Sequence, residues 1–197
     1  AASGIDALTH CLETYVALNA TPISEMFSIE GMRLISGSIR QAVHNGGDLK
    51  ARSDMLLGSY YGGVCLAGAS AGAIHALSYP LGGRYHIPHG VSNAMLFPHV
   101  MEFNFLGNLE KFAIIAEILG EDLEGLSLRE AAETAVDAVR TLCEDVSIPT
   151  TLGELNIDSD AIPELSEAAS MITRILDFNP RRITKNDIIQ IYERAAG

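Results

Sequence analysis

Residues 62–77 read Gly-Gly-Val-Cys-Leu-Ala-Gly-Ala-Ser-Ala-Gly-Ala-Ile-His-Ala-Leu, a run in which small side chains recur at three- and four-residue spacing. Small residues at this spacing let helix backbones approach one another closely. We therefore expect this run to form a buried helix at the centre of the fold. Gly68 and Gly72 then indicate close helix packing rather than a phosphate-binding loop, because the chain contains neither a strand followed by GxGxxG nor a GxxxxGK[ST] motif.

Outward from this run, start and stop signals divide the chain into further helices. Thr21-Pro22 predicts one helix start, Asn45-Gly46-Gly47 predicts its end, and Asp48 predicts the next start. Ser3, with Asp6 three residues later, is typical of a capping box that starts the first helix. Apolar periodicity favours five more helices, near residues 89–106, 108–119, 127–146, 160–176 and 184–195.

One stretch interrupts this pattern. Residues 81–88 contain Gly82-Gly83 and Pro88, which break helices, so we expect a loop there. No segment alternates apolar and polar residues over the length of a strand. The sequence therefore predicts a single all-α domain of many helices over residues 1–197.

Composition excludes several classes of function. The chain has 197 residues with 13 Lys+Arg against 25 Asp+Glu, a formal net charge of −12. An acidic surface of this kind repels phosphate backbones, so we expect no nucleic-acid partner. No apolar run approaches the roughly 20 residues of a membrane span, and no signal peptide opens the chain, so we expect no membrane partner.

The cysteines and the first residue bear on location and completeness. Cys11, Cys65 and Cys143 are few, odd in number and far apart, which argues against a disulfide framework and favours a reducing cytoplasm. The chain begins at Ala1 without a Met, directly at a predicted helix start. We therefore expect it to be part of a longer protein.

Four residues carry metal-binding chemistry. Asp6 and His10 are four residues apart on a predicted helix, so their side chains share one face. His75 lies in the small-residue run, where an imidazole would be buried, and His89 follows Pro88 at the start of the next helix. One carboxylate with three imidazoles suits a divalent ion such as Fe²⁺ or Zn²⁺. Each residue also has a structural explanation: a polar surface pair for the first two, a core histidine bonded to a carbonyl for the third, and a simple N-terminal helix residue for the fourth.

The other histidines have weaker claims. His86, three residues before His89, is a candidate for the edge of the site, either as a partner of a ligand or as a proton donor and acceptor. His44 abuts the Asn-Gly-Gly stop of a helix, where the dipole favours positive charge. His99 follows Pro98 on an apolar helix and is interpreted as structural.

The motifs around these residues resemble those of the iron-containing (group III) alcohol dehydrogenases. The similar stretches are Gly4-Ile5-Asp6-Ala7-Leu8-Thr9-His10-Cys11-Leu12-Glu13, His75-Ala76-Leu77-Ser78-Tyr79-Pro80-Leu81-Gly82-Gly83, His86-Ile87-Pro88-His89-Gly90 and the tail Asn179-Pro180-Arg181 with Asp187-Ile188 and Ile191-Tyr192. The resemblance implies that Asp6, His10, His75 and His89 are the four metal ligands. It implies the helical C-terminal half of the dehydroquinate synthase-like/iron-containing alcohol dehydrogenase fold.

The same resemblance implies an activity and partners. The activity is metal-assisted hydride transfer between a small alcohol or aldehyde and NAD(P), with Fe²⁺ or Zn²⁺ as the ion. NAD(P) would bind to an N-terminal α/β domain that is absent from this chain. No cofactor-binding residue is identified in the chain itself. We therefore expect the 197-residue chain alone to be inactive. A homodimer is the expected assembly.

Finer positions follow from the same resemblance. Some members carry a histidine four residues after the third ligand, where this chain has Tyr79, so the role of proton relay passes to Tyr79 or to His86. Four residues would approach the substrate pocket by family position: Leu66, Ile175, Phe178 and Asn179. Two alternatives remain. One is a dehydroquinate synthase-like or glycerol dehydrogenase-like zinc domain, a poorer match because those relatives lack a counterpart of His10. The other is a non-catalytic metal-binding helical fragment.

Overall fold

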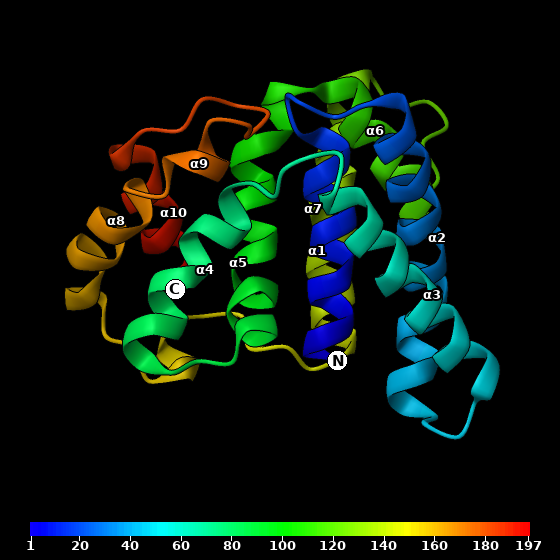
Figure 1. Ribbon diagram of the computed structural model, residues 1–197, viewed down its shortest axis with the longest axis horizontal. Helices are drawn as coiled ribbons and strands as arrows, with labels where there is room; N and C mark the ends of the chain where they lie inside the picture. The colour runs from blue at the N-terminus through cyan, green and yellow to red at the C-terminus, as the bar shows by residue number, and fades with distance from the viewer.

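The computed structural model describes residues 1–197 and consists of α-helices and short 3-10 helices without a strand, as the sequence predicts (Figure 1). The helices are α1 (Ala2–Val16), α2 (Pro22–His44), α3 (Leu49–Leu66), α4 (Ala73–Tyr85), α5 (His89–Asn104), η1 (Phe105–Gly107), α6 (Leu109–Leu119), α7 (Leu128–Asp145), η2 (Gly153–Leu155), η3 (Ser159–Ala161), α8 (Ile162–Ser170), α9 (Thr173–Leu176) and α10 (Lys185–Ala196). None of these helices combines the length and apolar character that crossing a membrane requires.

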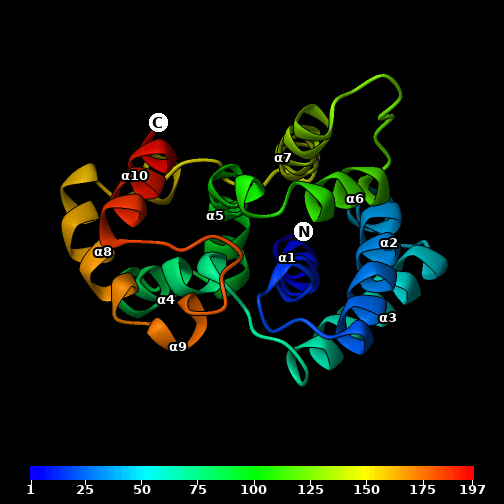
Figure 2. The same cartoon turned by 90° about the horizontal axis from the view of Figure 1, so that it is seen from above.

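The central element is α1. Seen from above, α1 lies end-on in the middle, with α2, α3 and α6 on one side and α5 on the other (Figure 2). Helices α8 to α10 pack on the far side against α4 and α5. Ile5, Leu8 and Cys11 on α1 have no exposed surface, and the core that they belong to is continuous through Tyr192 of α10. Burying these side chains supplies the main driving force for the fold.

The small-residue run does not form the predicted single helix. Helix α3 ends at Leu66 and α4 begins at Ala73, so residues 67–72, with Gly68 and Gly72, form a turn between them. A Cβ on Gly72 would lie 3.1 Å from Oε1 of Glu13 and 3.2 Å from Oδ1 of Asn179. The glycine leaves room for these two side chains, whose oxygens accept the first backbone N–H groups of α4, those of Ala73 and Ile74.

The predicted loop over 81–88 is also wrong, because α4 continues through Pro80, Gly82 and Gly83 to Tyr85. Tertiary packing outweighs the poor local propensity of these residues. Leu81 is fully buried, and the Tyr192 hydroxyl donates a 2.5 Å hydrogen bond to the Leu77 carbonyl in the middle of this helix. The actual loop is residues 86–88.

The predicted helix starts differ in outcome. Thr21 forms a capping box with Ser24 at the start of α2, and Asp48 caps α3 through the Ala51 N–H, as predicted. Ser3 is not a cap, because α1 already begins at Ala2 without a side-chain cap. The predicted helix over 160–176 is two helices, α8 and α9.

Pro98 lies inside α5 and cannot donate to the carbonyl of Ala94 four residues earlier. The buried thiol of Cys143 on α7 lies 3.8 Å from that carbonyl oxygen, within hydrogen-bonding reach for sulfur, and donates to it. This contact links α7 to α5 at the point where the helix has lost its own bond. A buried polar group is thus satisfied from a neighbouring helix.

Candidate metal centre

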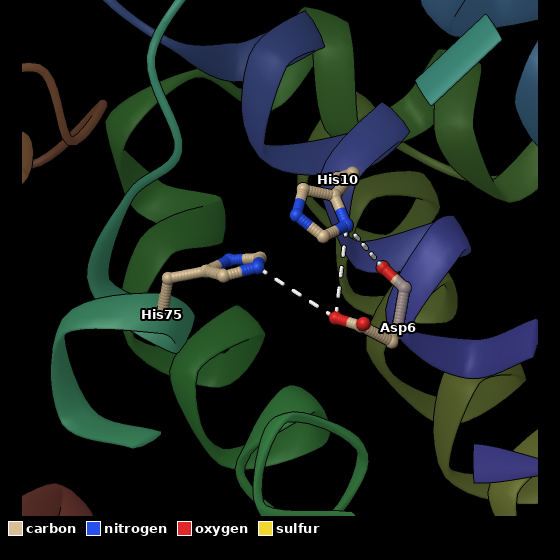
Figure 3. A group of neighbouring side chains, drawn as sticks. All are labelled: Asp6, His10 and His75. Carbon is tan, nitrogen blue, oxygen red and sulfur yellow. Dashed lines mark hydrogen bonds and ion pairs between the residues drawn. The ribbon is translucent and has the colours of Figure 1, made fainter. Parts of the chain in front are cut away.

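Asp6 and His10 lie on one face of α1, one turn apart (Figure 3). The Nδ1 of His10 lies 2.9 Å from the backbone carbonyl of Asp6 and 3.6 Å from the carboxylate Oδ1 of the same residue. A histidine whose Nδ1–H donates to a carbonyl keeps its lone pair on Nε2. The local helix geometry therefore orients both the carboxylate and the imidazole.

Two further helices bring imidazoles to the same carboxylate. His75 is in the first turn of α4 and His89 is the first residue of α5. Their Nε2 atoms lie 3.6 Å and 3.8 Å from Oδ1 of Asp6. Ligand atoms of Asp6, His10 and His75 are all within 4.8 Å of one another, whereas His89 lies at the rim with 45% of its side chain exposed. We call Asp6, His10, His75 and His89 the site cluster.

The site cluster fits a divalent metal ion. The Nε2 of His75 is buried and has no hydrogen-bond partner, and it faces Asp6 (Figure 3). An unsatisfied buried polar atom costs about 1–3 kcal/mol, which an ion bound to that atom would remove. Imidazole nitrogens together with one carboxylate oxygen form a donor set that suits Zn²⁺ or Fe²⁺.

Glu13 is a residue of this region that the sequence analysis missed. Its carboxylate is 3% exposed; Oε2 lies 2.5 Å from Nδ1 of His75, and Oε1 accepts the Ile74 N–H at 2.6 Å. The available signal was its place in the same motif, three residues after His10. Glu13 thus fixes both the ring of His75 and the start of α4 to α1.

Asn93 is the second missed residue. It is fully buried, and its Nδ2 lies 2.7 Å from Oδ1 of Asp6 and 3.0 Å from Nε2 of His89, while its Oδ1 has no partner. Asn93 follows His89 by four residues, the same spacing that places Asp6 and His10 on one face. That spacing was the signal that could have identified it.

The electrostatics of the cluster favour a cation. Burial would raise the pKa of Asp6, but the neighbouring His75 and Asn93 and the charges of His10 and His89 together hold it below its ordinary value. Burial also disfavours the charged form of His75 and so lowers its pKa, but the carboxylates of Glu13 and Asp6 outweigh this and raise the pKa to about 9. Two carboxylates thus stabilise positive charge at this point of the fold.

Comparison with known proteins identifies the family. The sequence model described as "Fe-containing alcohol dehydrogenase family, C-terminal" matches residues 1–196.

The chain belongs to the Fe-containing alcohol dehydrogenase family.

The names of similar family members refer to different alcohols. The chain is 41% identical to the 1,3-propanediol dehydrogenase of Citrobacter freundii, covering 99% of this chain and 50% of that protein. It is 43% identical to long-chain-alcohol dehydrogenase 1 of Geobacillus thermodenitrificans (strain NG80-2), covering 99% of this chain and 49% of that protein. The crystal structure of a 1,3-propanediol oxidoreductase superposes with a TM-score of 0.96 at 40% identity, over 99% of this chain and 51% of that one. The chain therefore spans about half the length of the relatives that it matches.

In this member of the Fe-containing alcohol dehydrogenase family, Tyr79 lies beside the site cluster. Its ring stacks on that of His89 with a centroid distance of 5.9 Å and meets His75 edge-on at 6.4 Å. The side chain is 42% exposed, so it borders the open side of the cluster. His86 ends α4 in the left-handed conformation and makes no hydrogen bond or ion pair to the cluster.

The four residues predicted near a substrate pocket fall into two groups. Leu66 at the end of α3 and Phe178 are partly exposed, at 40% and 37%. Ile175 lies in the core, and Asn179 is buried with its amide bonded to other buried groups. The role of all four in a substrate pocket stays a prediction, and the structure gives Asn179 a clear structural role.

Proposed function

We propose that this chain is the metal-binding half of an NAD(P)-dependent alcohol dehydrogenase, with Asp6, His10, His75 and His89 as the ligands of Fe²⁺ or Zn²⁺. The reaction is hydride transfer between a small alcohol or aldehyde and the nicotinamide. NAD(P) binding is assigned to the half of the protein that the relatives have and this chain does not span. The proposal includes a homodimer in the cytoplasm, in keeping with three free thiols.

One observation carries the proposal. The Nε2 atoms of His75 and His89, from two helices, lie 3.6 Å and 3.8 Å from a single carboxylate oxygen of Asp6, and the buried Nε2 of His75 has no partner. His10 shares a face of α1 with Asp6. A purely structural cluster would pair its buried atoms, since unpaired ones are costly. The arrangement is therefore better explained by an ion than by packing.

The chemistry follows from the positions of the side chains. A divalent ion held here would act as a Lewis acid toward the oxygen of an alcohol or carbonyl. Asp6 contributes negative charge, and the half-buried His10 and the buried His75 hold the inner side of the site. His89 and Tyr79 form the open side, where a substrate would approach and where the phenol can donate or accept a hydrogen bond. His86 is the alternative candidate for proton transfer.

The test of the ligand assignment is the metal content of variants. We expect the chain purified with Zn²⁺ to hold about one equivalent, and His75→Ala and His89→Ala to lose most of it, measured by elemental analysis. His44→Ala is the matched control: His44, at the end of α2, bonds to the carbonyl of Asp145 at the end of α7, away from the site cluster, so this variant should retain the metal. Unchanged metal content in both site variants would contradict the assignment. His10→Ala separates four ligands from the three-ligand zinc alternative, which predicts full metal retention.

A further inference from the structure

Glu13 is nearly fully buried, at 3% exposure, and its carboxylate contacts no cation of Lys or Arg. Burying an ionised carboxylate is costly unless hydrogen bonds satisfy it. Its two oxygens instead receive two N–H groups of one helical turn, the backbone N–H of Ile74 and the Nδ1–H of His75, at 2.6 Å and 2.5 Å. Both of its contacts are thus devoted to the start of α4.

The contact to His75 decides which nitrogen of that ring is free. In the neutral ring, the form that binds a metal, a proton held on Nδ1 by the carboxylate leaves the lone pair on Nε2, the atom that lies 3.6 Å from Oδ1 of Asp6. Metal-binding histidines commonly donate their other N–H to a carboxylate in this way, which fixes the tautomer and the ring orientation. Gly72 keeps the path open, since a Cβ there would lie 3.1 Å from Oε1 of Glu13.

We propose that Glu13 is a positioning residue of the site, which holds the Nδ1 proton of His75 so that Nε2 of this imidazole faces the ion. The inference rests on the metal site of the proposed function and adds a residue outside the four ligands. The contact of Oε1 with the Ile74 N–H has a second consequence. It fixes the backbone adjacent to His75, so that ring orientation and helix position are set by one side chain.

Glu13→Gln is the informative substitution because it keeps size and shape. A carboxylate accepts from two N–H donors, but an amide has one acceptor oxygen and one NH₂ group. Either the NH₂ faces the Ile74 N–H, donor against donor, or it faces Nδ1 of His75 and favours the tautomer with the proton on Nε2. Both arrangements weaken metal binding without removing a ligand.

The first experiment measures the Zn²⁺ dissociation constant of the chain by competition with a chelator. We expect Glu13→Gln to raise it 10–100-fold. Glu25→Gln is the matched control, because Glu25 also joins two helices through a 2.6 Å ion pair with Lys111 but does not contact the site cluster. The Zn²⁺ dissociation constant of Glu25→Gln should stay within about twofold of the wild-type value, because Glu25 does not orient any metal ligand.

The second experiment distinguishes positioning from general stability. In the ¹⁵N-labelled, Zn²⁺-loaded wild-type chain, the imidazole shifts of His75 should report a protonated Nδ1 and a metal-bound Nε2, while Glu13→Gln should lose this signature. The wild-type spectrum tests the proposal even if the variant fails to fold, because metal bound at Nδ1 would overturn it. So would a dissociation constant of Glu13→Gln equal to that of the wild type. A wild-type chain that binds no Zn²⁺ overturns the metal site and this proposal together, which distinguishes the two failures.

Discussion

Two groups of buried and partly buried polar side chains meet at the first turn of α4, and they differ in how completely their buried atoms are paired. The tail network consists of Asn104, Asn179 and Arg181. Oδ1 of Asn179 accepts the Ala73 N–H and Nδ2 of Asn104, while its Nδ2 donates to Asn104 and to the Arg181 carbonyl. Arg181 in turn donates to the Phe103 carbonyl at 2.8 Å and lies over the Phe103 ring.

The site cluster and the neighbouring Asn93, next to this network, leave buried atoms unpaired. Nε2 of His75 and Oδ1 of Asn93 are buried without a partner, whereas the tail network has no such atom. Buried polar groups that only support a fold are normally satisfied within the protein. The difference teaches where to look for a ligand, namely where buried polar atoms converge but are not paired with one another.

The largest expected effect is on the paired side. Asn179→Ala removes four hydrogen bonds and leaves buried groups of Asn104 and α4 unsatisfied, so we expect a loss of about 3 kcal/mol in the free energy of unfolding. Urea denaturation of the metal-free chain, followed by circular dichroism because the chain has no Trp, measures it. A loss below about 1 kcal/mol would mean that the network does not support the fold as described.

The next largest effect is the stabilisation of the fold by metal bound at the site cluster. Free Zn²⁺ at about 100 times its dissociation constant should add about 2.7 kcal/mol to the free energy of unfolding of the wild type. His75→Ala should gain almost nothing, because the inner ligand is gone. Asn179→Ala should retain most of the gain despite its lower stability. Equal stabilisation of the wild type and His75→Ala by Zn²⁺ would remove the distinction between the two groups.

The smallest expected effect is the loss of stability in Asn93→Ala. It can be compared directly with Asn179→Ala because both residues are buried asparagines. Asn93→Ala removes one hydrogen bond to Asp6 and the contact with His89. It leaves fewer buried polar groups without a hydrogen-bond partner than Asn179→Ala does. We expect the metal-free chain to lose about 1 kcal/mol, measured by the same urea titration. If Asn93→Ala costs as much as Asn179→Ala, then the pairing seen around each amide does not determine its contribution.

Much of the fold was predictable because its signals are local. The cap residues Thr21 and Asp48 lie within three residues of the N–H groups that they satisfy, and periodicity alone indicates the all-α class. The extension of α4 through Pro80 was not predictable, because Tyr192 and the packing of Leu81 involve residues that are distant in the sequence. Local propensity favours a break there, and tertiary contacts override it.

The candidate site divides in the same way. The spacing of Asp6 and His10 already predicts a shared face, and the structure brings His75 to them from a helix more than sixty residues later. Glu13 and Asn93 escaped notice because a carboxylate or an amide on a helix is usually a solvated residue. Their burial and their contacts with His75 and Asp6, which only the folded chain reveals, place them beside the site cluster.

Gly72 gives the two groups a common boundary. Glu13 from the first helix and Asn179 from the tail both reach past this residue to adjacent N–H groups at the start of α4. Asn179 therefore helps to hold the start of α4, which carries His75, although Asn179 lies about a hundred residues further along the chain. Truncation or fusion of the chain near Asn179 is therefore expected to loosen the start of α4 even though it leaves every residue of the site cluster in place.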